Sequence, residues 1–345
     1  MKSKILVTGG LGFIGSHTVV ALLQKDYEVV IIDNLSNSSI DVLGGITKIT
    51  QETPEFEKID LRNKEQVKNF FEKYNDIHGV IHFAASKAVG ESVEDPLLYY
   101  ENNISSLIYL LKELSRKGNA NFIFSSSCTV YGQADFLPIT EDAPVKVAMS
   151  PYGNTKQIGE EIIRDTCRVH PDFKAISLRY FNPIGAHPSA EIGELPIGTP
   201  QNLIPFITQT AIGKREQLSV FGDDYPTADG TCIRDYIHVM DLARAHIVAL
   251  ERLMENKARE NYDVFNLGTG EGSSVLQVIN TFEKVSGQNL PYKIVDRREG
   301  DITSAYADTH KANNVLGWKA QESLEEALRS AWKWENRVNE NESAQ

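Results

Sequence analysis

The stretch VTGGLGFIGSH (Val7–His17) points to the fold class, because its glycines fall between a strand-like run and a helical pattern. Gly9, Gly12 and Gly15 form the pattern GxxGxxG directly after the apolar run Lys4–Thr8. Glycine at such positions lets bare backbone approach a pyrophosphate at the amino end of a helix. The same glycines could serve only a tight turn, so the pattern needs support from elsewhere in the chain.

Apolar runs of this kind recur through the first half of the chain and alternate with helical patterns. They are rich in Ile and Val and nearly continuous, as is typical of strands that are buried on both faces of a parallel sheet. The fold is therefore predicted to be α/β, with a doubly wound parallel sheet of the Rossmann type. The predicted strands are Lys4–Thr8, Glu28–Asp33, Gly79–Phe83, Asn121–Ser125, Ala175–Arg179 and, rejoining the sheet later, Val264–Leu267.

The residue composition changes from Asn182 to about Arg234. Pro, Gly and short apolar segments there indicate a loop-rich second unit. We expect this smaller unit to be mixed α/β. Helical signals return with capping-box patterns at Ser274–Gln277 and Ser323–Glu326. Two further expectations are one long amphipathic helix over Pro96–Gly118 and a frayed polar tail over Asn339–Gln345.

Composition excludes several classes of protein. The 345 residues suit about two domains. A net charge of −12, from 35 Lys and Arg against 47 Asp and Glu, disfavours binding to nucleic acid. No apolar run approaches the roughly 18 residues of a membrane span, so no membrane partner is expected. Cys128, Cys167 and Cys232 form no CxxC pair, which argues against a zinc or other metal site and favours buried thiols in the cytoplasm.

Asp33 strengthens the dinucleotide interpretation, because it ends the second predicted strand about twenty residues after the glycines. A carboxylate there can accept hydrogen bonds from the ribose of an adenosine and disfavours a 2′-phosphate. We therefore expect NAD rather than NADP as the cofactor. The alternative is that Asp33 is an ordinary loop acid.

Tyr152 and Lys156 lie four residues apart after Ser150 and Pro151, so a helix that starts there places both side chains on one face. A neighbouring ammonium favours the phenolate and makes the tyrosine a usable base near neutral pH. YxxxK alone is also typical of a polar helix surface. Ser127 favours the catalytic interpretation, because it follows a predicted strand and can exchange hydrogen bonds with a substrate alcohol.

Specific motifs extend along nearly the whole chain, from Lys4 to about Trp334. They are Val7–His17 (VTGGLGFIGSH), His82–Ser92 (HFAASKAVGES), Phe124–Gly132, Ser150–Lys156 (SPYGNTK), Arg179–Pro188 (RYFNPIGAHP), Arg234–Asp241 (RDYIHVMD) and Arg297–Asp301 (RREGD). Together they resemble the extended short-chain dehydrogenase/reductase superfamily and, within it, the UDP-glucose 4-epimerase family.

The resemblance implies an NAD-binding domain of residues 1–181 and 236–272 and a UDP-sugar-binding domain of residues 182–235 and 273–338. The implied NAD contacts are Gly9, Gly12, Phe13, Ile14, Asp33, Asn34, Asn37, Ser38, Asp60, Leu61, Phe83, Ala84, Lys87, Asn102, Tyr152, Lys156 and Tyr180. The implied substrate contacts are Ser127, Asn182, Asn202, Leu203, Arg234, Tyr236, Arg298, Asp301 and Ala305. Arg234 and Arg298 also suit capture of a diphosphate by their chemistry, with structural salt bridges as the alternative.

The resemblance further implies reversible inversion at carbon 4 of UDP-glucose and UDP-galactose. In that mechanism Tyr152, helped by Lys156, takes the proton of the sugar's 4-hydroxyl while hydride passes from carbon 4 to NAD. The resulting 4-keto sugar turns over and receives the hydride on its opposite face. The resemblance also implies a homodimer in which the helices that begin near Pro96 and Pro151 form a four-helix bundle. The apolar stripe of the first of these helices could equally pack against the sheet.

Three alternatives share the glycines or the YxxxK pattern. Sugar-nucleotide dehydratases resemble one another in an Asp-Glu pair after the hydroxyl residue, and related decarboxylases tend to carry a glutamate there. This chain has Cys128 and Thr129 instead, which lack the proton carriers for elimination. A non-catalytic NAD-binding regulator is the third alternative, but such relatives typically lose the tyrosine or the lysine.

Ala305 departs from part of the implied family. In epimerases restricted to the plain hexoses, a bulky tyrosine stands at this position, four residues after the aspartate of the RREGD motif, beside carbon 2 of the sugar. The small Ala305 predicts that UDP-GlcNAc and UDP-GalNAc are accepted as well. The alternative is that Tyr306 occupies the same space through a slip of one residue. His17 and His238 are expected to be structural, because they have no partners at metal-ligand spacing.

Overall fold

The computed structural model describes residues 2–118, 120–298 and 301–343. Its centre is a seven-stranded sheet in the order β11-β6-β5-β4-β1-β2-β3, with every pair of neighbours parallel. This order confirms the predicted doubly wound parallel sheet. The strands are β1 (Lys4–Thr8), β2 (Glu28–Asp33), β3 (Glu55–Lys58), β4 (Ile77–His82), β5 (Ala120–Ser127), β6 (Phe173–Tyr180) and β11 (Tyr262–Leu267).

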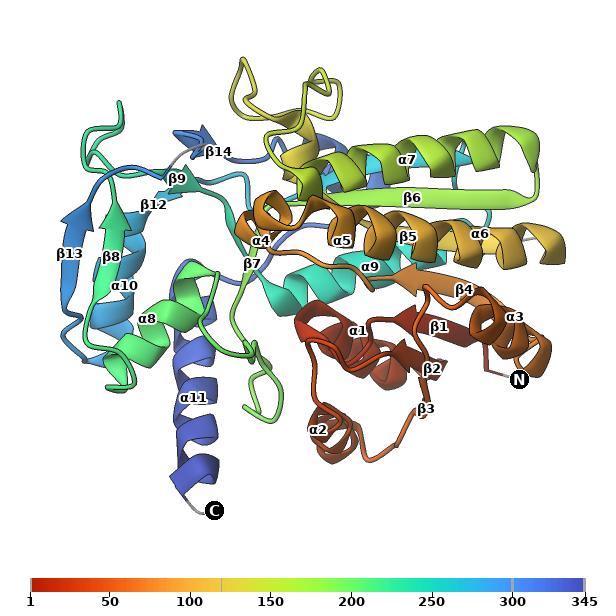
Figure 1. Cartoon of the computed structure of the whole chain (residues 1–345), viewed down its shortest axis with the longest axis horizontal. Helices are drawn as coiled ribbons and strands as arrows, with labels where there is room; N and C mark the ends of the chain where they lie inside the picture. The colour runs from red at the N-terminus through yellow and green to blue at the C-terminus, as the bar shows by residue number, and fades with distance from the viewer. Residues whose placement is uncertain (1, 119, 299–300, 344–345) are drawn as a thin grey trace.

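Helices cover both faces of this sheet, as Figure 1 shows. One face packs against α1 (Phe13–Gln24), α2 (Asp41–Thr50) and α9 (Val239–Met254). The other packs against α3 (Lys64–Lys73), α6 (Ser106–Lys117) and α7 (Pro151–Val169). Buried Ile, Val and Leu fill both layers, which explains why the strands read as continuous apolar runs.

β3 and the carboxyl-terminal helix differ from what the sequence predicts. β3 is short, reads EFEK and pairs only with β2 at the sheet edge, so it carries no apolar pattern to detect. The predicted frayed tail is wrong, because helix α11 (Leu324–Ser343) continues through Asn339 to Ser343, whose hydroxyl donates to the Asn339 carbonyl at 2.8 Å. Residues 344–345 of that prediction lie outside the described residues, as do residues 299–300 of the RREGD motif.

The predicted long helix is present as three consecutive helical segments without a break. They are α5 (Pro96–Tyr100), the π-turn η1 (Glu101–Ser105) and α6. Leu107, Leu111 and Leu114 are buried against the sheet, whereas Ile104 and Ile108 remain half-buried. The apolar stripe therefore has a core side and an outward side. Two short helices flank this region: α4 (Val89–Glu94) and the 3-10 turn η2 (Cys128–Tyr131).

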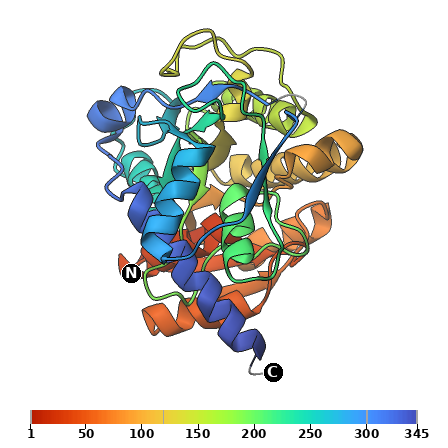
Figure 2. The same ribbon diagram turned by 90° about the vertical axis from the view of Figure 1, so that its left-hand side faces the viewer.

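The remaining elements form a smaller mixed part beside the carboxyl ends of the large sheet (Figures 1 and 2). Its strands are β7 (Asn182–Ile184) with β10 (Tyr236–His238), β12 (Ser273–Ser274) with β9 (Ile233–Arg234) and β14 (Ser304–Ala305), and β13 (Tyr292–Val295) with β8 (Leu218–Phe221). Its helices are α8 (Leu203–Ala211), α10 (Val275–Ser286), the π-turn η3 (Ala312–Leu316) and α11. The predicted capping box at Ser274 is complete, and Ser323 accepts the backbone N–H of Glu326. Among the described residues, no helix has both the length and the hydropathy for crossing a bilayer.

Candidate functional site

The candidate site lies at the carboxyl edge of the large sheet. Residues at the ends of several strands, and the turns that follow them, come together there. β1 is followed by the glycine turn, β2 ends at Asp33, β4 is followed by Phe83 and β6 ends at Tyr180. β5 ends at Ser127. Parallel strands deliver all these residues to one edge, although they are far apart in the sequence.

The glycine turn has the geometry of a pyrophosphate cradle. Gly9 has a φ of +67°, and a Cβ on it would lie 2.7 Å from the backbone nitrogen of Ala84. A Cβ on Gly15 would lie 2.2 Å from the Gly9 carbonyl oxygen, so close packing of α1 on the turn requires glycine there. Gly12 is the N-cap of α1 and has no side chain to cover the first backbone N–H groups of that helix. An anion can therefore approach these donors, as a dinucleotide pyrophosphate does.

Asp33 is fixed at the end of β2 by three donors. Its carboxylate accepts the backbone N–H groups of Leu11 at 3.1 Å and Leu35 at 3.0 Å, and the Ser38 hydroxyl at 2.8 Å. The carboxyl edge of the sheet, which we call the rim of the site, continues at Asn34. The Asn34 side chain is hydrogen-bonded to Asp60, which follows β3. An oriented acid beside the cradle fits the ribose of an adenosine, so the donor set of this chain fits NAD.

The remaining predicted cofactor contacts extend this rim, with one exception. Phe13 and Ile14 open α1, Asn37 and Ser38 lie in the loop after β2, and Asp60 and Leu61 follow β3. Asn102, in η1, donates from Nδ2 to the Ser86 hydroxyl at 2.9 Å. The exception is Lys87, which is half exposed and lies 3.4 Å from Glu194 of the smaller part.

Tyr152, Lys156 and Ser127 come together as the spacing predicted. Ser150 caps α7 by accepting the backbone N–H of Gly153, so Tyr152 and Lys156 lie one turn apart. The Tyr152 phenol is hydrogen-bonded to Ser127 at the end of β5. The Lys156 ammonium donates to the Ser125 carbonyl at 2.7 Å and lies 5.8 Å from the centre of the Tyr152 ring. This places a phenol, a hydroxyl and a cation in one group.

Burial acts on both titrating members of this group. It raises the pKa of Tyr152 to about 12, and the hydrogen bond from Ser127 works in the opposite direction. Burial also lowers the pKa of Lys156 to about 8, against the effect of the Glu160 carboxylate. Positive charge near the phenol is therefore what would make Tyr152 a base near neutral pH.

Cys128 and Thr129 occupy the turn directly after Ser127. The Thr129 backbone N–H donates to the Ser127 hydroxyl oxygen at 3.2 Å. Burial raises the pKa of the Cys128 thiol to about 12, so this thiol does not exchange protons readily near neutral pH. The turn thus supplies no acid for the elimination of water.

The predicted substrate residues form two groups in the smaller part. Asp301 pairs with Arg298 through both carboxylate oxygens at 3.1 Å, and with Arg234 at 3.8 Å. Arg234 also acts electrostatically on Cys128, which brings this cationic group to the catalytic turn. Asn182 and Tyr236 adjoin this first group, because they pair with each other through β7 and β10 and Tyr236 lies two residues after Arg234. Asn202 and Leu203, at the start of α8, form the second group beside Glu194.

Ala305 and Tyr306 lie on opposite sides of their strand. Ala305 is buried, pairs with Arg234 and packs in a cluster with Val130 and Phe181. Tyr306 lies instead against Gly272, where an added Cβ would meet its ring at 3.1 Å. The small side chain therefore faces the catalytic turn, and the bulky one faces away from it.

Three carboxylates in and around the site were missed from the sequence. Glu194 accepts the Asn202 amide at 2.6 Å and lies beside Lys87, so one acid connects a predicted substrate contact with a predicted cofactor contact. Asp235 accepts the Ala307 backbone N–H at 3.1 Å and thereby fixes the strand of Ala305. Only Glu160, four residues after Lys156, had a detectable signal, since this spacing places both on one face of α7.

The two histidines expected to be structural have structural partners. The His17 ring bonds to the Phe13 carbonyl at 2.6 Å, and the His238 ring caps α9 by accepting the Met240 backbone N–H at 3.0 Å. Among residues 2–118, 120–298 and 301–343, no group of three or more metal-ligating side chains is found.

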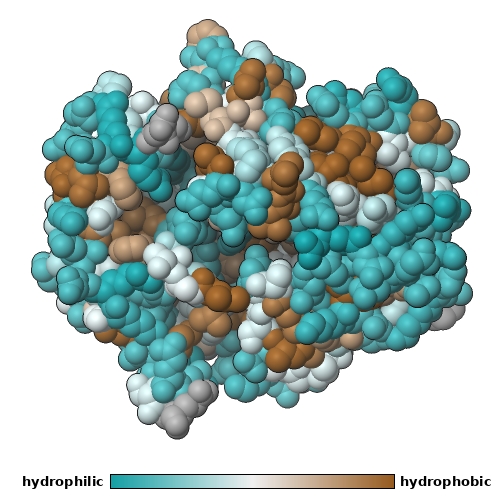
Figure 3. Space-filling model, in the orientation of Figure 1, coloured by the Kyte–Doolittle hydropathy of each residue, from teal (hydrophilic) through white to brown (hydrophobic). Residues whose placement is uncertain are grey.

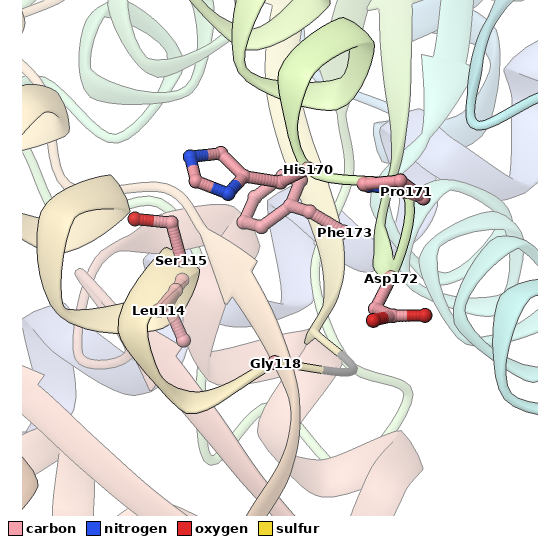
Figure 4. A pocket seen from close by; sticks show the side chains of 7 residues that line it. All are labelled: Leu114, Ser115, Gly118, His170, Pro171, Asp172 and Phe173. Atoms are coloured by element: carbon pink, nitrogen blue, oxygen red, sulfur yellow. The ribbon is translucent and has the colours of Figure 1, made fainter.

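A small pocket of about 90 Å³, shown in Figure 4, lies beside the amino ends of β5 and β6, at the opposite end of the sheet from the candidate site. It is bounded by the end of α6, by the turn before β6 and by the first residue of β6. The lining residues are Leu114, Ser115, Gly118, His170, Pro171, Asp172 and Phe173. It lies at the amino ends of β5 and β6, whereas ligands of such folds bind at the carboxyl ends.

Known proteins resemble this chain over nearly its whole length. Residues 6–331 match the family described as GDP-mannose 4,6 dehydratase. A UDP-glucose 4-epimerase of Bacillus subtilis is 51% identical over 332 residues, which cover 96% of each chain. The UDP-glucose-4-epimerase structure from Stenotrophomonas maltophila, with bound NAD and formylated UDP-arabinopyranose, superimposes with a TM-score of 0.94 at 45% identity, covering 98% of this chain and 99% of the other. The UDP-Glc/GlcNAc 4-epimerase of Campylobacter jejuni gives 0.83 at 39% identity, covering 97% and 99%.

Proposed function

The chain belongs to the UDP-glucose 4-epimerase family, within the larger family described as GDP-mannose 4,6 dehydratase, and we propose that it interconverts UDP-glucose and UDP-galactose. The observation that carries this proposal is the group of Tyr152, Ser127 and Lys156 at the end of β5, beside the glycine cradle. Cys128 and Thr129 stand where a dehydratase would need acids, which favours epimerisation over the other activities of the larger family.

The cofactor is NAD, which when bound would accept a hydride from carbon 4 of the sugar and return it to the opposite face. Tyr152 takes the proton of the 4-hydroxyl as general base and later returns it to the oxygen at carbon 4. Ser127 hydrogen-bonds that same oxygen and keeps it beside the phenol. Lys156, held on the Ser125 carbonyl, stabilises the phenolate by its charge.

Recognition of the UDP-sugar falls to the smaller part of the molecule. Arg234 and Arg298 suit bidentate contacts to a diphosphate, and they supply local positive charge in a chain of net charge −12. Asn182, Asn202, Leu203 and Tyr236 would complete the nucleotide and sugar contacts. In this proposal residues 1–181 and 236–272 bind NAD, while residues 182–235 and 273–338 bind the UDP-sugar.

N-acetylated substrates are included in the proposal. Ala305 faces the catalytic turn, and Tyr306 lies on the other side of the strand against Gly272. A methyl group at this position leaves volume beside carbon 2 of a hexose for an N-acetyl group. UDP-GlcNAc and UDP-GalNAc would therefore react as well.

We also propose a homodimer through α6 and α7. Figure 3 shows hydrophobic side chains gathered over the area where these helices lie in Figure 1. Ile104 of η1, Ile108 of α6 and Ile158 of α7 are half-buried, and none of them belongs to the hydrophobic clusters of the core. Leu97 is 76% exposed and extends this surface. Light scattering at several concentrations tests the dimer, and a concentration-independent monomer would contradict it.

The cytoplasm is the proposed location, because Cys128, Cys167 and Cys232 are all free thiols. Fractionation of cells with an antibody to the protein tests this location, and recovery from an oxidising compartment would contradict it.

Chromatography of reaction products tests the activity. The purified protein is incubated without added cofactor, separately with UDP-galactose and with UDP-GalNAc. Conversion of both sugars is the expected result, because the enzyme retains its NAD and accepts the larger substrate. Conversion of UDP-galactose alone would contradict the wider substrate range, and conversion of neither would contradict the proposed function.

A further inference from the structure

A buried ion pair lies one helical turn beyond the catalytic lysine. Arg179 of β6 and Glu160 of α7 are 6% and 3% exposed, and Arg179 Nη2 lies 2.5 Å from Glu160 Oε2. Arg179 Nε donates to the other carboxylate oxygen at 2.9 Å. The Ser126 hydroxyl donates to that same oxygen at 2.5 Å. Three donors therefore fix the carboxylate of Glu160 in one position.

The register of the sheet explains this arrangement. Ser126 and Arg179 are paired on β5 and β6, so their side chains project to the same face, toward α7. The neighbouring residue Ser125 accepts the Lys156 ammonium through its backbone carbonyl. Lys156 and Glu160 thus fasten α7 to consecutive residues of the strand that ends at Ser127.

Charge is the reason to assign this pair more than a structural role. The Lys156 ammonium is buried, and a buried cation without a nearby anion tends to lose its proton. The titratable or charged groups around the Tyr152–Lys156 pair are Tyr152 and Glu160 of α7, His82 of β4, Tyr99 of α5, Arg179 and Tyr180 of β6, and Cys128 of η2. Burial raises the pKa of Tyr99, so this phenol is neutral.

Of these groups, Glu160 provides the negative charge, since its carboxylate accepts two hydrogen bonds from the Arg179 guanidinium. Burial lowers the pKa of His82 to about 3, so this ring is neutral. Burial raises the pKa values of Tyr180 and Cys128, so both are neutral as well. Arg179 is a cation that fixes the Glu160 carboxylate from the side of β6, whereas Glu160 is the charged group that raises the pKa of Lys156.

We propose that Glu160 is a positioning residue for the reaction, which keeps the Lys156 ammonium charged and seated on β5 beside Tyr152. The proposal rests on the proposed function, because it concerns the acid/base group of that reaction. Glu160 acts through Lys156 and does not touch the substrate. Ser126 and Arg179 hold its carboxylate, so they contribute indirectly.

The test is a titration of Lys156 that does not depend on turnover. Protein labelled with 13C at the lysine ε-carbons is titrated by NMR, and the Lys156 signal is identified by its loss in Lys156→Arg. The midpoint is expected near pH 8 in the unsubstituted protein. In Glu160→Gln it falls by about one pH unit, since a neighbouring opposite charge shifts a pKa by about 1–3 units.

Turnover gives a second readout. Glu160→Gln should lower kcat about tenfold at neutral pH, leave KM within about twofold and move the alkaline limb of the kcat profile to lower pH. If the enzyme has no epimerase activity at all, the proposed function fails while the NMR titration still decides the role of Glu160.

Two further variants separate charge from folding. Asp241→Asn is the matched control. Asp241 is also a buried carboxylate paired with an arginine, Arg244, but it lies on α9 and not on α7. It should leave the Lys156 midpoint unchanged. If Glu160→Gln does not fold, the double variant Glu160→Gln/Arg179→Met removes both charges and should still lower the midpoint. A midpoint within about 0.3 pH units of the unsubstituted protein in the folded variant would overturn the proposal.

Discussion

The two halves of the molecule hold their site residues by different means. In the sheet half, the backbone of the parallel strands positions the site residues. Asp33, Ser127 and Tyr180 end strands, and Gly9 directly follows one. In the smaller half, the candidate contacts stand on short strands of two or three residues, at the start of α8 or in loops. Charged side chains hold some of them in place, as in the contacts of Asp301 with Arg234 and Arg298. The comparison indicates that chemistry is placed on the rigid half and recognition on the half held together by side chains.

This difference has energetic consequences. A backbone ladder buried on both faces resists local change, so substitutions there should affect the chemical step when they remove a reacting group. Exposed ion pairs stabilise a protein by only about 0–1 kcal/mol. An arginine in such a pair can therefore leave its carboxylate partner and bind a phosphate with little loss of free energy. Substitutions of such arginines should therefore act on KM.

The largest effect is expected in the sheet half, from Tyr152→Phe. Removal of the phenolic hydroxyl takes away the general base, so kcat should fall by a factor of about 10²–10⁴. KM should change little, because recognition lies in the other half. Steady-state kinetics with UDP-galactose measure both values, and Tyr109→Phe on α6 is the matched control. A loss confined to KM would contradict the division between the halves.

The next largest effect is expected in the smaller half, from Arg298→Ala. Loss of a charged hydrogen bond costs about 1.5–3 kcal/mol, so KM for the UDP-sugar should rise about 10- to 100-fold with kcat nearly unchanged. Arg297→Ala is the control, because the neighbouring Arg297 pairs with Asp224 instead of Asp301. Equal effects of the two substitutions in the same kinetic assay would show that Arg298 has no special role.

A smaller and selective effect is expected from Ala305→Tyr. The phenol ring would fill the space on the side of the catalytic turn, so activity on UDP-GalNAc should fall at least about tenfold, which corresponds to about 1.4 kcal/mol. Activity on UDP-galactose should stay within about twofold. The ratio of the two kcat/KM values is measured on one preparation. An unchanged ratio would mean that this part of the smaller half does not set specificity.

The last expected effect concerns stability in acid and not activity. Burial lowers the pKa values of His17 and His82 to about 3 and that of His246 to about 4, and all three lie in the sheet half. The unfolded chain binds protons on these rings below about pH 6.5, whereas the folded chain does not. Their contribution to stability is therefore complete above about pH 6.5 and is lost as the pH falls toward 3–4.

Denaturant unfolding between pH 4 and 7.5 measures this loss. Each histidine should contribute a slope of about 1.4 kcal/mol per pH unit. His246→Phe should remove one such slope. An unfolding free energy that is independent of pH over this range would contradict the burial of these rings as neutral groups.

More of the sheet half than of the smaller half could be predicted from the sequence, for physical reasons. Strand ends, the glycine turn and the Tyr152–Lys156 spacing follow from local periodicity, so the sheet half could be placed from residues alone. β3 was not predicted, because a charged edge strand has no apolar pattern. Asn202 and Arg298 came only from the family resemblance, because loops bring them to the site. Glu194 and Asp235 were missed, since their partners lie in distant segments of the chain that no spacing reveals.

The most direct test of the account follows the hydrogen at carbon 4. UDP-glucose with deuterium at that carbon is converted in ordinary water, and the UDP-galactose formed is analysed by mass spectrometry and NMR. If Tyr152 handles only the hydroxyl proton while hydride leaves and returns within the site, the product keeps the deuterium at carbon 4. Replacement of that deuterium by solvent hydrogen would contradict the account.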